Sequence, residues 1–384
     1  MIQKNNLKRF LGKGLMQPAY AFTVFAKRLR GYLYYLYGSG KSGYPESITL
    51  FLTYRCNLRC KMCGQWGARG VTKRYGPNEV NKELELSVLY GLIDDVAPFK
   101  PNITLFGGEP LLYPGCTGLI KRIKERGMHC LMITNGSLIG RSAEDILESG
   151  LDELNVSLDG NAALHDKIRG SAGLFDTIMR GLAKLKDLKA NAGRKKPLLN
   201  LQCTITKYNY LYLDELLEVA AESGADSLTF HNLVFIDHEL LLKQRKCDDI
   251  LGCKSTGWEG FVFDPGIDAG VLNEKIRKIS EGKYGFKTDF YPAFSGKSLL
   301  EYYADPSCVP SGYANRCLSP WMTAYILPDG EMRPCLNLTY SYGNIASSGF
   351  KELWNNEKAI TFRKELKGQR TFPACARCTE LYRY

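Results

Sequence analysis

Two kinds of apolar pattern alternate along this chain: short runs rich in β-branched residues, and longer stretches with apolar residues at helical spacing. The strand-like runs are residues 47–53, 103–106, 130–134, 153–158, 200–206 and 227–230. Helical spacing is clearest in Val88, Leu89, Leu92, Ile93 and Val96, and again in Phe175, Ile178, Met179 and Leu182. Strand and helix repeated in this way predict parallel strands with right-handed crossovers. Six units lie between Ser47 and about Asp237, fewer than the eight of a closed barrel, so we expect an α/β fold with an open, partial (β/α)6 TIM-like barrel.

Three cysteines follow the first strand-like run, in the order Cys56, Cys60, Cys63. A cubane [4Fe-4S] cluster is normally held by four thiolates, so three closely spaced cysteines leave one iron open for another ligand. A structural zinc site or buried thiols are the alternatives, but zinc normally takes four closed ligands and no fourth lies nearby. The pattern therefore favours a cluster with a reactive iron.

The second strand-like run ends in Gly107, Gly108, Glu109 and Pro110. Glycines without Cβ suit a place where the backbone must approach another group closely. Polar residues also end later strands, and in parallel barrels ligands collect at these carboxyl ends.

CxxxCxxC after a first strand, with GGEP one βα unit later, resembles the radical SAM superfamily. The resemblance implies a [4Fe-4S] cluster on Cys56, Cys60 and Cys63, with S-adenosylmethionine chelating the free iron and an electron donor such as flavodoxin or ferredoxin. It also implies the following contacts with S-adenosylmethionine: Gly107, Gly108, Glu109 and Pro110 at the amino group, Ser157 and Asp159 at the ribose with Asn135 nearby, and Arg169 at the methionine carboxylate. On physical grounds alone, Arg169 is more simply read as a solvated or salt-bridged surface arginine. The family usually has an aromatic residue where this chain has Met62.

A second cysteine set lies near the carboxyl end, where Cys317 and Cys335 are followed by Cys375 and Cys378. Residues 324–333 read as a β-hairpin around an Asp-Gly turn, which would project Cys335 from its return strand. The set resembles a SPASM or twitch auxiliary-cluster domain, but it is shorter than a full SPASM domain. The resemblance implies one auxiliary [4Fe-4S] cluster with four protein ligands, which would pass an electron rather than chelate substrate. A tetrathiolate zinc site is the alternative.

The other six cysteines receive no role. Cys116, Cys130 and Cys203 lie in or beside apolar segments, so we expect them to be buried. Cys247, Cys253 and Cys308 lie in a less regular region and stay unassigned. A length of 384 residues does not fit a small disulfide scaffold, and no signal peptide is visible. Oxygen-labile clusters need a reducing compartment, so we expect a cytoplasmic protein.

Positive charge is concentrated at the start of the chain. The formal net charge is +11, and residues 1–45 hold eight Lys or Arg and no acidic residue. These cations are interleaved with apolar residues at roughly helical spacing, among them Phe22, Phe25, Leu29, Leu33 and Leu36. Such a leader suits peripheral contact with an anionic membrane, and the alternatives are a helix packed across the open bottom of the barrel or a docking surface for an acidic protein. No apolar run approaches the ~20 residues needed to span a bilayer. No nucleic-acid-binding motif accompanies the charge.

These observations predict four segments: a basic amphipathic leader (1–46), a radical SAM core (47–237), a connecting, substrate-covering region (238–307) and an auxiliary-cluster domain (308–384). The resemblance implies that a 5'-deoxyadenosyl radical takes a hydrogen atom from an unidentified small molecule or peptide. We expect a two-electron oxidation, with His231, Asp237 or His238 as candidate bases. One alternative is radical modification or carbon–carbon bond formation on a membrane-presented lipid or lipid-linked sugar. The other is a non-catalytic iron-sulfur or zinc protein.

Overall fold

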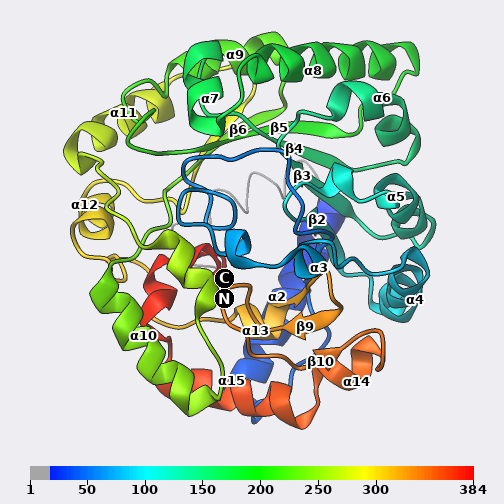
Figure 1. The fold of residues 1–384 in the computed structure, drawn as a ribbon, viewed down its shortest axis with the longest axis vertical. Helices are drawn as coiled ribbons and strands as arrows, with labels where there is room; N and C mark the ends of the chain where they lie inside the picture. Colours follow the sequence, from blue (N-terminus) through cyan, green and yellow to red (C-terminus); the bar gives the residue numbers. More distant parts are fainter. Residues whose placement is uncertain (1–17) are drawn as a thin grey trace.

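A computed structural model describes residues 18–384. Residues 1–17, which include part of the predicted basic leader, lie outside the described residues. Figure 1 shows helices arranged as a ring around a set of strands, with the carboxyl terminus near the middle of the view. The strands are β1 (Ser47–Phe51), β2 (Asn102–Phe106), β3 (Cys130–Thr134), β4 (Glu153–Ser157), β5 (Leu198–Thr204), β6 (Ser227–His231), β7 (Lys287–Tyr291), β8 (Thr323–Ile326), β9 (Glu331–Arg333) and β10 (Gly343–Asn344).

Within residues 18–384 these strands form one sheet in the order β10-β9-β8-β1-β2-β3-β4-β5-β6-β7. All neighbours from β8 to β7 pair in parallel, whereas β9 and β10 pair in antiparallel fashion. Strands β1 to β6 confirm the six predicted units. The sheet extends further at both edges, because β7 lies in the predicted connecting region and β8 belongs to the carboxyl-terminal segment. The partial-barrel fold class is confirmed.

Helices cover the outside of the barrel and follow the strands as the apolar spacing predicts. The α-helices are α2 (Pro18–Tyr37), α3 (Pro77–Val80), α4 (Leu86–Val96), α5 (Cys116–Glu125), α6 (Ile139–Glu148), α7 (Ala162–Arg169), α8 (Leu174–Asn191), α9 (Glu215–Ser223), α10 (His238–Leu251), α11 (Ala269–Glu281), α12 (Lys297–Ala304), α13 (Ser319–Met322), α14 (Phe350–Trp354) and α15 (Glu357–Gln369). Short 3₁₀ turns complete the connections, among them η4 (Pro110–Leu112) after β2 and η6 (Pro373–Arg377) near the carboxyl end.

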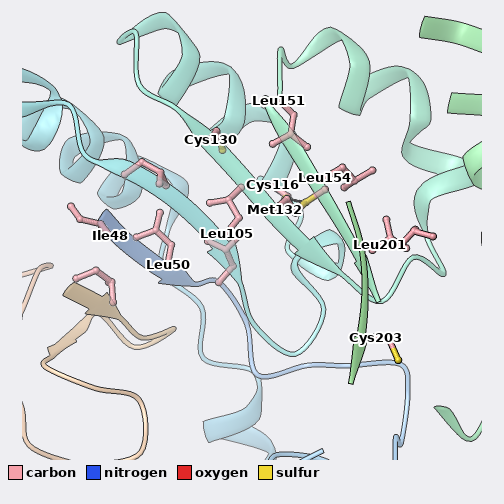
Figure 2. Close-up of a cluster of buried hydrophobic side chains, with 14 of the residues drawn as sticks. Ile48, Leu50, Leu105, Cys116, Cys130, Met132, Leu151, Leu154, Leu201 and Cys203 are labelled. Atoms are coloured by element: carbon pink, nitrogen blue, oxygen red, sulfur yellow. Dashed lines mark hydrogen bonds between the residues drawn. The ribbon is translucent and has the colours of Figure 1, made fainter. Parts of the chain in front are cut away.

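The main core lies between the outward faces of the strands and the helices. Figure 2 shows Ile48, Leu105, Met132, Leu154 and Leu201 from successive strands packed together. Cys116, Cys130 and Cys203 are buried in the same core, as expected of small apolar side chains, and the Cys116 thiol lies 3.7 Å from the sulfur of Met132. Alternate residues along each strand face the opposite way, into the lumen.

The amino-terminal side of the barrel is closed by α2. Arg28 forms an ion pair of 2.8 Å with Glu46, the residue before β1, and its guanidinium lies 5.2 Å from the ring centre of Tyr384. Lys27 donates to the carbonyl of Lys100 at 2.6 Å, just before β2. The described part of the leader is therefore a helix packed across the bottom of the barrel, as one of the alternatives proposed.

Candidate active site

The loop after β1 brings three thiols together. Cys60 is buried, and Cys56 and Cys63 are partly buried. Backbone N–H groups point at two of the sulfurs: Leu58 at 3.5 Å from Cys56 Sγ and Trp66 at 3.3 Å from Cys63 Sγ. Burial raises the pKa of Cys56 to about 11. A metal ligand must be a thiolate, and N–H donors directed at sulfur stabilise that charge, so the loop fits a cluster bound through its three cysteines.

The GGEP residues pack directly on this loop. Gly108 N donates to Thr53 O at 2.8 Å, and Glu109 N donates to Arg55 O at 2.9 Å. A Cβ at Gly108 would lie 2.2 Å from Arg55 O, so only glycine allows this approach. The structure thus gives the glycine a task that sequence reasoning missed, which is contact with the cysteine loop.

The Glu109 side chain is fully buried and held by three donors. Its carboxylate accepts hydrogen bonds from Thr134 Oγ1 (2.7 Å), Asn135 N (2.8 Å) and Leu111 N (3.2 Å), the last at the start of η4. Burial raises the pKa of Glu109, and these donors oppose the rise. Thr134 was not among the predicted site residues, although its place at the end of β3, directly before Asn135, was a usable signal.

Asn135, Asp159 and Arg169 also converge on the cysteine loop. Asn135 Nδ2 donates to Asn57 Oδ1 at 2.9 Å and lies 3.9 Å from Cys56 Sγ. Arg169 pairs with Asp159 at 2.6 Å and lies 3.7 Å from Cys60 Sγ. Ser157 ends β4, two residues before Asp159.

Arg169 is only 8% exposed, so it is not a solvated surface arginine, but it is salt-bridged, as the other half of that alternative expected. Burial disfavours its charge, but Asp159 beside it outweighs that effect and the pKa of Arg169 is raised. Asp159 is also fully buried and accepts a hydrogen bond from Thr204 N at 2.9 Å. Asp159 therefore has protein partners at both carboxylate oxygens, and no local sequence pattern predicts these long-range contacts.

The four carboxyl-terminal cysteines come together from separate elements. Cys317 precedes α13, Cys335 follows β9, and Cys375 and Cys378 lie in and just after η6. The predicted hairpin is present as β8 and β9, with Gly330 at a φ of +87° in its turn. Burial raises the pKa of Cys375 to about 11 and of Cys378 to about 12. Burial also raises the pKa of Cys317, and the charges of the other three thiols add to the rise. All four cysteines line the same cavity.

Two unassigned cysteines lie close to this set. The charge of Cys253 adds to the raised pKa of Cys335, and that of Cys247 adds to the raised pKa of Cys375. In residues 18–384, no group of three or more His, Cys, Asp or Glu side chains is close enough to hold a single metal ion.

A cavity of about 670 Å³ joins the barrel lumen to the four carboxyl-terminal cysteines. Its walls include Gly64 and Gln65 of the cysteine loop and reach Val24 and Arg28 of α2 at the other end. Of the three candidate bases, only His231 lines it. Asp237 is exposed and caps α10 by accepting from Leu240 N at 2.7 Å, and His238 is exposed on that helix.

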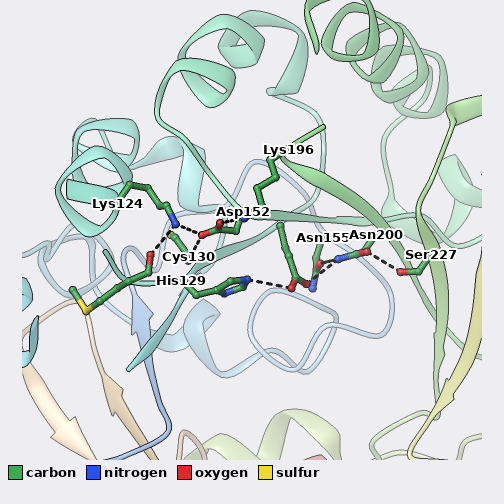
Figure 3. A network of polar contacts seen from close by, with 10 residues as sticks. Lys124, His129, Cys130, Asp152, Asn155, Lys196, Asn200 and Ser227 are labelled. Atoms are coloured by element: carbon green, nitrogen blue, oxygen red, sulfur yellow. Dashed lines mark hydrogen bonds and ion pairs between the residues drawn. The ribbon is translucent and has the colours of Figure 1, made fainter. Parts of the chain in front are cut away.

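Polar side chains form a network on the lumen side of β3 to β6 (Figure 3). His129 Nε2 lies 3.3 Å from Glu153, Asn200 donates to Glu153 at 3.1 Å and to Asn155 at 2.9 Å, and Ser227 donates to Asn200 at 2.8 Å. Beside it, burial acts against the charge of Asp152, but Lys124 and Lys196 outweigh burial and lower its pKa. On this side the lumen therefore presents polar groups that are already hydrogen-bonded to one another, beside apolar residues such as Ile103, Leu131 and Ile133.

Comparison with known proteins agrees with this geometry. Residues 50–195 match the model of the radical SAM superfamily, and residues 317–379 match SPASM, an iron-sulfur cluster-binding domain. The chain is 34% identical over 324 residues to Fe-coproporphyrin III synthase of Methanosarcina barkeri, covering 79% of this chain and 72% of that protein. This chain belongs to the radical SAM superfamily.

Two further comparisons cover most of this radical SAM enzyme. It is 25% identical over 352 residues to the tungsten-containing aldehyde ferredoxin oxidoreductase cofactor-modifying protein of Pyrococcus furiosus, covering 86% of each chain. Among solved structures, SuiB of Streptococcus suis bound to S-adenosylmethionine aligns with a TM-score of 0.61 and 17% identity, over 86% of this chain and 70% of SuiB. At that identity the likeness shows the fold alone.

Membership of the family settles the cofactors. The radical SAM domain uses a [4Fe-4S] cluster and S-adenosylmethionine, and the SPASM domain binds auxiliary iron-sulfur. The non-catalytic alternative and the zinc alternative are therefore wrong. None of the helices in residues 18–384 has the length and hydrophobicity to span a bilayer.

Proposed function

We propose that this radical SAM enzyme oxidises a small molecule by two electrons inside the 670 Å³ cavity. The observation that carries the proposal is that this one cavity has Gly64 and Gln65, directly after Cys63, together with His231 and all four carboxyl-terminal cysteines in its walls. Its volume lies within the range of roughly 300–1,000 Å³ found for small-molecule sites. A small molecule fits such a space better than a folded peptide does.

The bound cofactors supply the 5'-deoxyadenosyl radical that takes a hydrogen atom from substrate, and an acceptor for the second electron. At the first cysteine site, Cys56, Cys60 and Cys63 would hold the cluster, and Glu109 would position the amino group of S-adenosylmethionine, with Asn135 near its ribose. The Arg169–Asp159 pair would fix Cys60 and the adjoining backbone. At the carboxyl-terminal cysteine site, the four protein thiolates would occupy all four ligand positions of the auxiliary cluster, so no position is left for substrate.

His231 would take the proton that the oxidised substrate loses. It ends β6 on the lumen side, and its ring lies 5.8 Å from that of Tyr291 at the end of β7. A neutral imidazole can accept a proton from substrate as a general base. The surrounding barrel wall keeps water from the reacting atoms.

The test begins with anaerobic reconstitution, an iron count, and dithionite with S-adenosylmethionine. We expect about eight irons per chain and release of 5'-deoxyadenosine. When a substrate is supplied, the product should be two hydrogens lighter, with one 5'-deoxyadenosine per product and no net use of reductant. His231→Gln should keep 5'-deoxyadenosine release and lose product, whereas exposed His238→Gln should keep both. A product that consumes reductant in each turnover would contradict the oxidation.

A second candidate is modification of a membrane-presented lipid or lipid-linked sugar. It is supported by the extension of the cavity to Val24 and Arg28 of α2, whose outer surface is apolar. Deleting residues 1–45 would not separate the two candidates, because α2 closes the barrel. Lipid-linked and soluble forms of the same sugar, offered to the intact chain, would separate them.

A further inference from the structure

The outer side of α2 presents a continuous apolar surface. Phe22, Phe25, Leu29, Leu33, Leu36 and Tyr37 recur at intervals of three and four residues along the helix, and all are exposed, with Phe22 at 73% and Tyr37 at 79%. We call these six residues the α2 apolar face. Soluble helices of this spacing normally bury such a stripe against the core. Here the core is contacted by the opposite side, through Val24, Arg28 and Gly31.

The helix cannot easily turn to hide this face. The Arg28–Glu46 pair and the Lys27 hydrogen bond to Lys100 O hold it on one side. Gly31 lies against Met322 of α13, where a built Cβ would be 2.5 Å from the methionine sulfur. The α2 apolar face is therefore a fixed surface on the amino-terminal side of the barrel, at the opposite ends of the strands from the cysteine loop.

Cations from two distant segments surround the face. Arg30 and Lys41 are exposed on or just after α2. From the carboxyl-terminal domain, Arg316 lies 5.1 Å from the ring of Tyr32, and Lys367 donates to the carbonyl of Leu36 at 2.8 Å. Residues 1–45 contribute eight Lys or Arg in all and no acidic residue.

We propose that the α2 apolar face is the site at which this enzyme docks on a membrane surface rich in anionic lipid. Apolar side chains with flanking cations match the two layers of such a surface, because the side chains reach the acyl boundary while the cations meet the headgroups. A second copy of the chain would match the apolar residues but would bring the same positive charge against itself. Docking holds the enzyme at the bilayer without crossing it, and it is independent of the reaction proposed above.

The test uses the reconstituted full-length protein and two matched triple variants. The first is Phe22→Gln, Leu29→Gln and Leu33→Gln on α2. The control is Leu242→Gln, Ile250→Gln and Leu300→Gln, which removes exposed apolar residues from α10 and α12. Gln is close to Leu in helix propensity, so the helices should persist. Circular dichroism and 5'-deoxyadenosine release with dithionite check that both variants fold.

Co-sedimentation is measured with vesicles of phosphatidylglycerol and phosphatidylcholine and with vesicles of phosphatidylcholine alone. We expect wild type and control to bind the anionic vesicles, with binding that weakens as salt rises. The α2 variant should bind roughly tenfold or more weakly, since three apolar anchors are lost. The proposal is overturned if wild type fails to bind anionic vesicles, or if the α2 variant binds as well as wild type. Self-association that the α2 variant abolishes, without vesicle binding, would overturn it in favour of a dimer.

Discussion

Acidification should destabilise this protein through His165, a buried histidine on α7. Its side chain is 0% exposed, and its Nδ1 accepts a hydrogen bond from the backbone N–H of Asp159 at 3.1 Å. Protonating Nδ1 would break that bond, and Nε2 has no hydrogen-bond partner among the described residues. Burial, aided by the charge of Arg169, lowers the pKa of His165 from 6.5 to about 4.

The size of the effect follows from the difference between the two pKa values. Between pH 6.5 and pH 4 the unfolded chain binds a proton at His165 that the folded chain does not, so stability falls as pH falls. A pKa that falls from 6.5 in the unfolded chain to about 4 in the folded chain corresponds to about 3 kcal/mol of unfolding free energy, lost once the pH is below both values. About 2 kcal/mol of this is already lost at pH 5.

Urea unfolding of the anaerobic apo protein at pH 7 and at pH 5 measures this loss. Because other groups also titrate, we compare the free energy of unfolding of wild type with that of His165→Gln at each pH. That difference should shrink by about 2 kcal/mol from pH 7 to pH 5, since the variant has no buried imidazole to protonate. Exposed His238→Gln is the control and should track wild type at both pH values. A difference that changes by less than about 0.5 kcal/mol would show that His165 is protonated in the folded state and would refute the reasoning.

Three further predictions concern the two cysteine sites. Asp159→Asn leaves Arg169 buried without its partner, so urea unfolding of the apo protein should show a free energy of unfolding about 3–5 kcal/mol lower than that of wild type. The control Asp187→Asn, at an exposed position, should leave this free energy almost unchanged. A loss under about 1 kcal/mol for Asp159→Asn would contradict the pairing. Cys375→Ser removes one of the four auxiliary-cluster ligands, so it should lower the iron count from about eight to about four per chain while 5'-deoxyadenosine is still released. Retention of about eight irons would exclude Cys375 as a ligand. Gly108→Ala places a Cβ 2.2 Å from Arg55 O, so it should reduce both the iron bound at the first cluster and the release of 5'-deoxyadenosine. The control Gly91→Ala, whose Cβ would have no atom within 4 Å, should change neither. Normal 5'-deoxyadenosine release from Gly108→Ala would contradict the close packing.

The sequence predicted those parts of the molecule that depend on local pattern. Strands β1 to β6 and the hairpin of β8 and β9 appear where apolar runs and turn residues placed them, because strand period and turn chemistry are local properties. The cysteine sets could be recognised for the same reason. Whether the first-site residues act on S-adenosylmethionine as predicted stays a prediction, and so do the four segment boundaries.

Long-range contacts could not be read from the pattern. The burial of Arg169 depends on Asp159, ten residues away in sequence, and on a cysteine loop more than a hundred residues earlier. Which of the three candidate bases lines the cavity depends on tertiary placement: His231 ends β6 on the lumen side, whereas Asp237 and His238 are exposed. The apolar stripe of α2 is visible in the sequence, but only the structure shows that the core takes the opposite side of the helix.

The pairing of β8 with β1 ties the two iron-sulfur sites to one rigid frame. β1 leads to Cys56, and β8 continues through its hairpin partner β9 to Cys335. Four residue pairs, from Ser47 with Thr323 to Leu50 with Ile326, join the two strands. Swinging one site away from the other would require this ladder to break. If the proposed oxidation passes an electron from the cavity to the auxiliary site, this ladder fixes the separation of the two sites, so that the transfer needs no movement of one domain against the other.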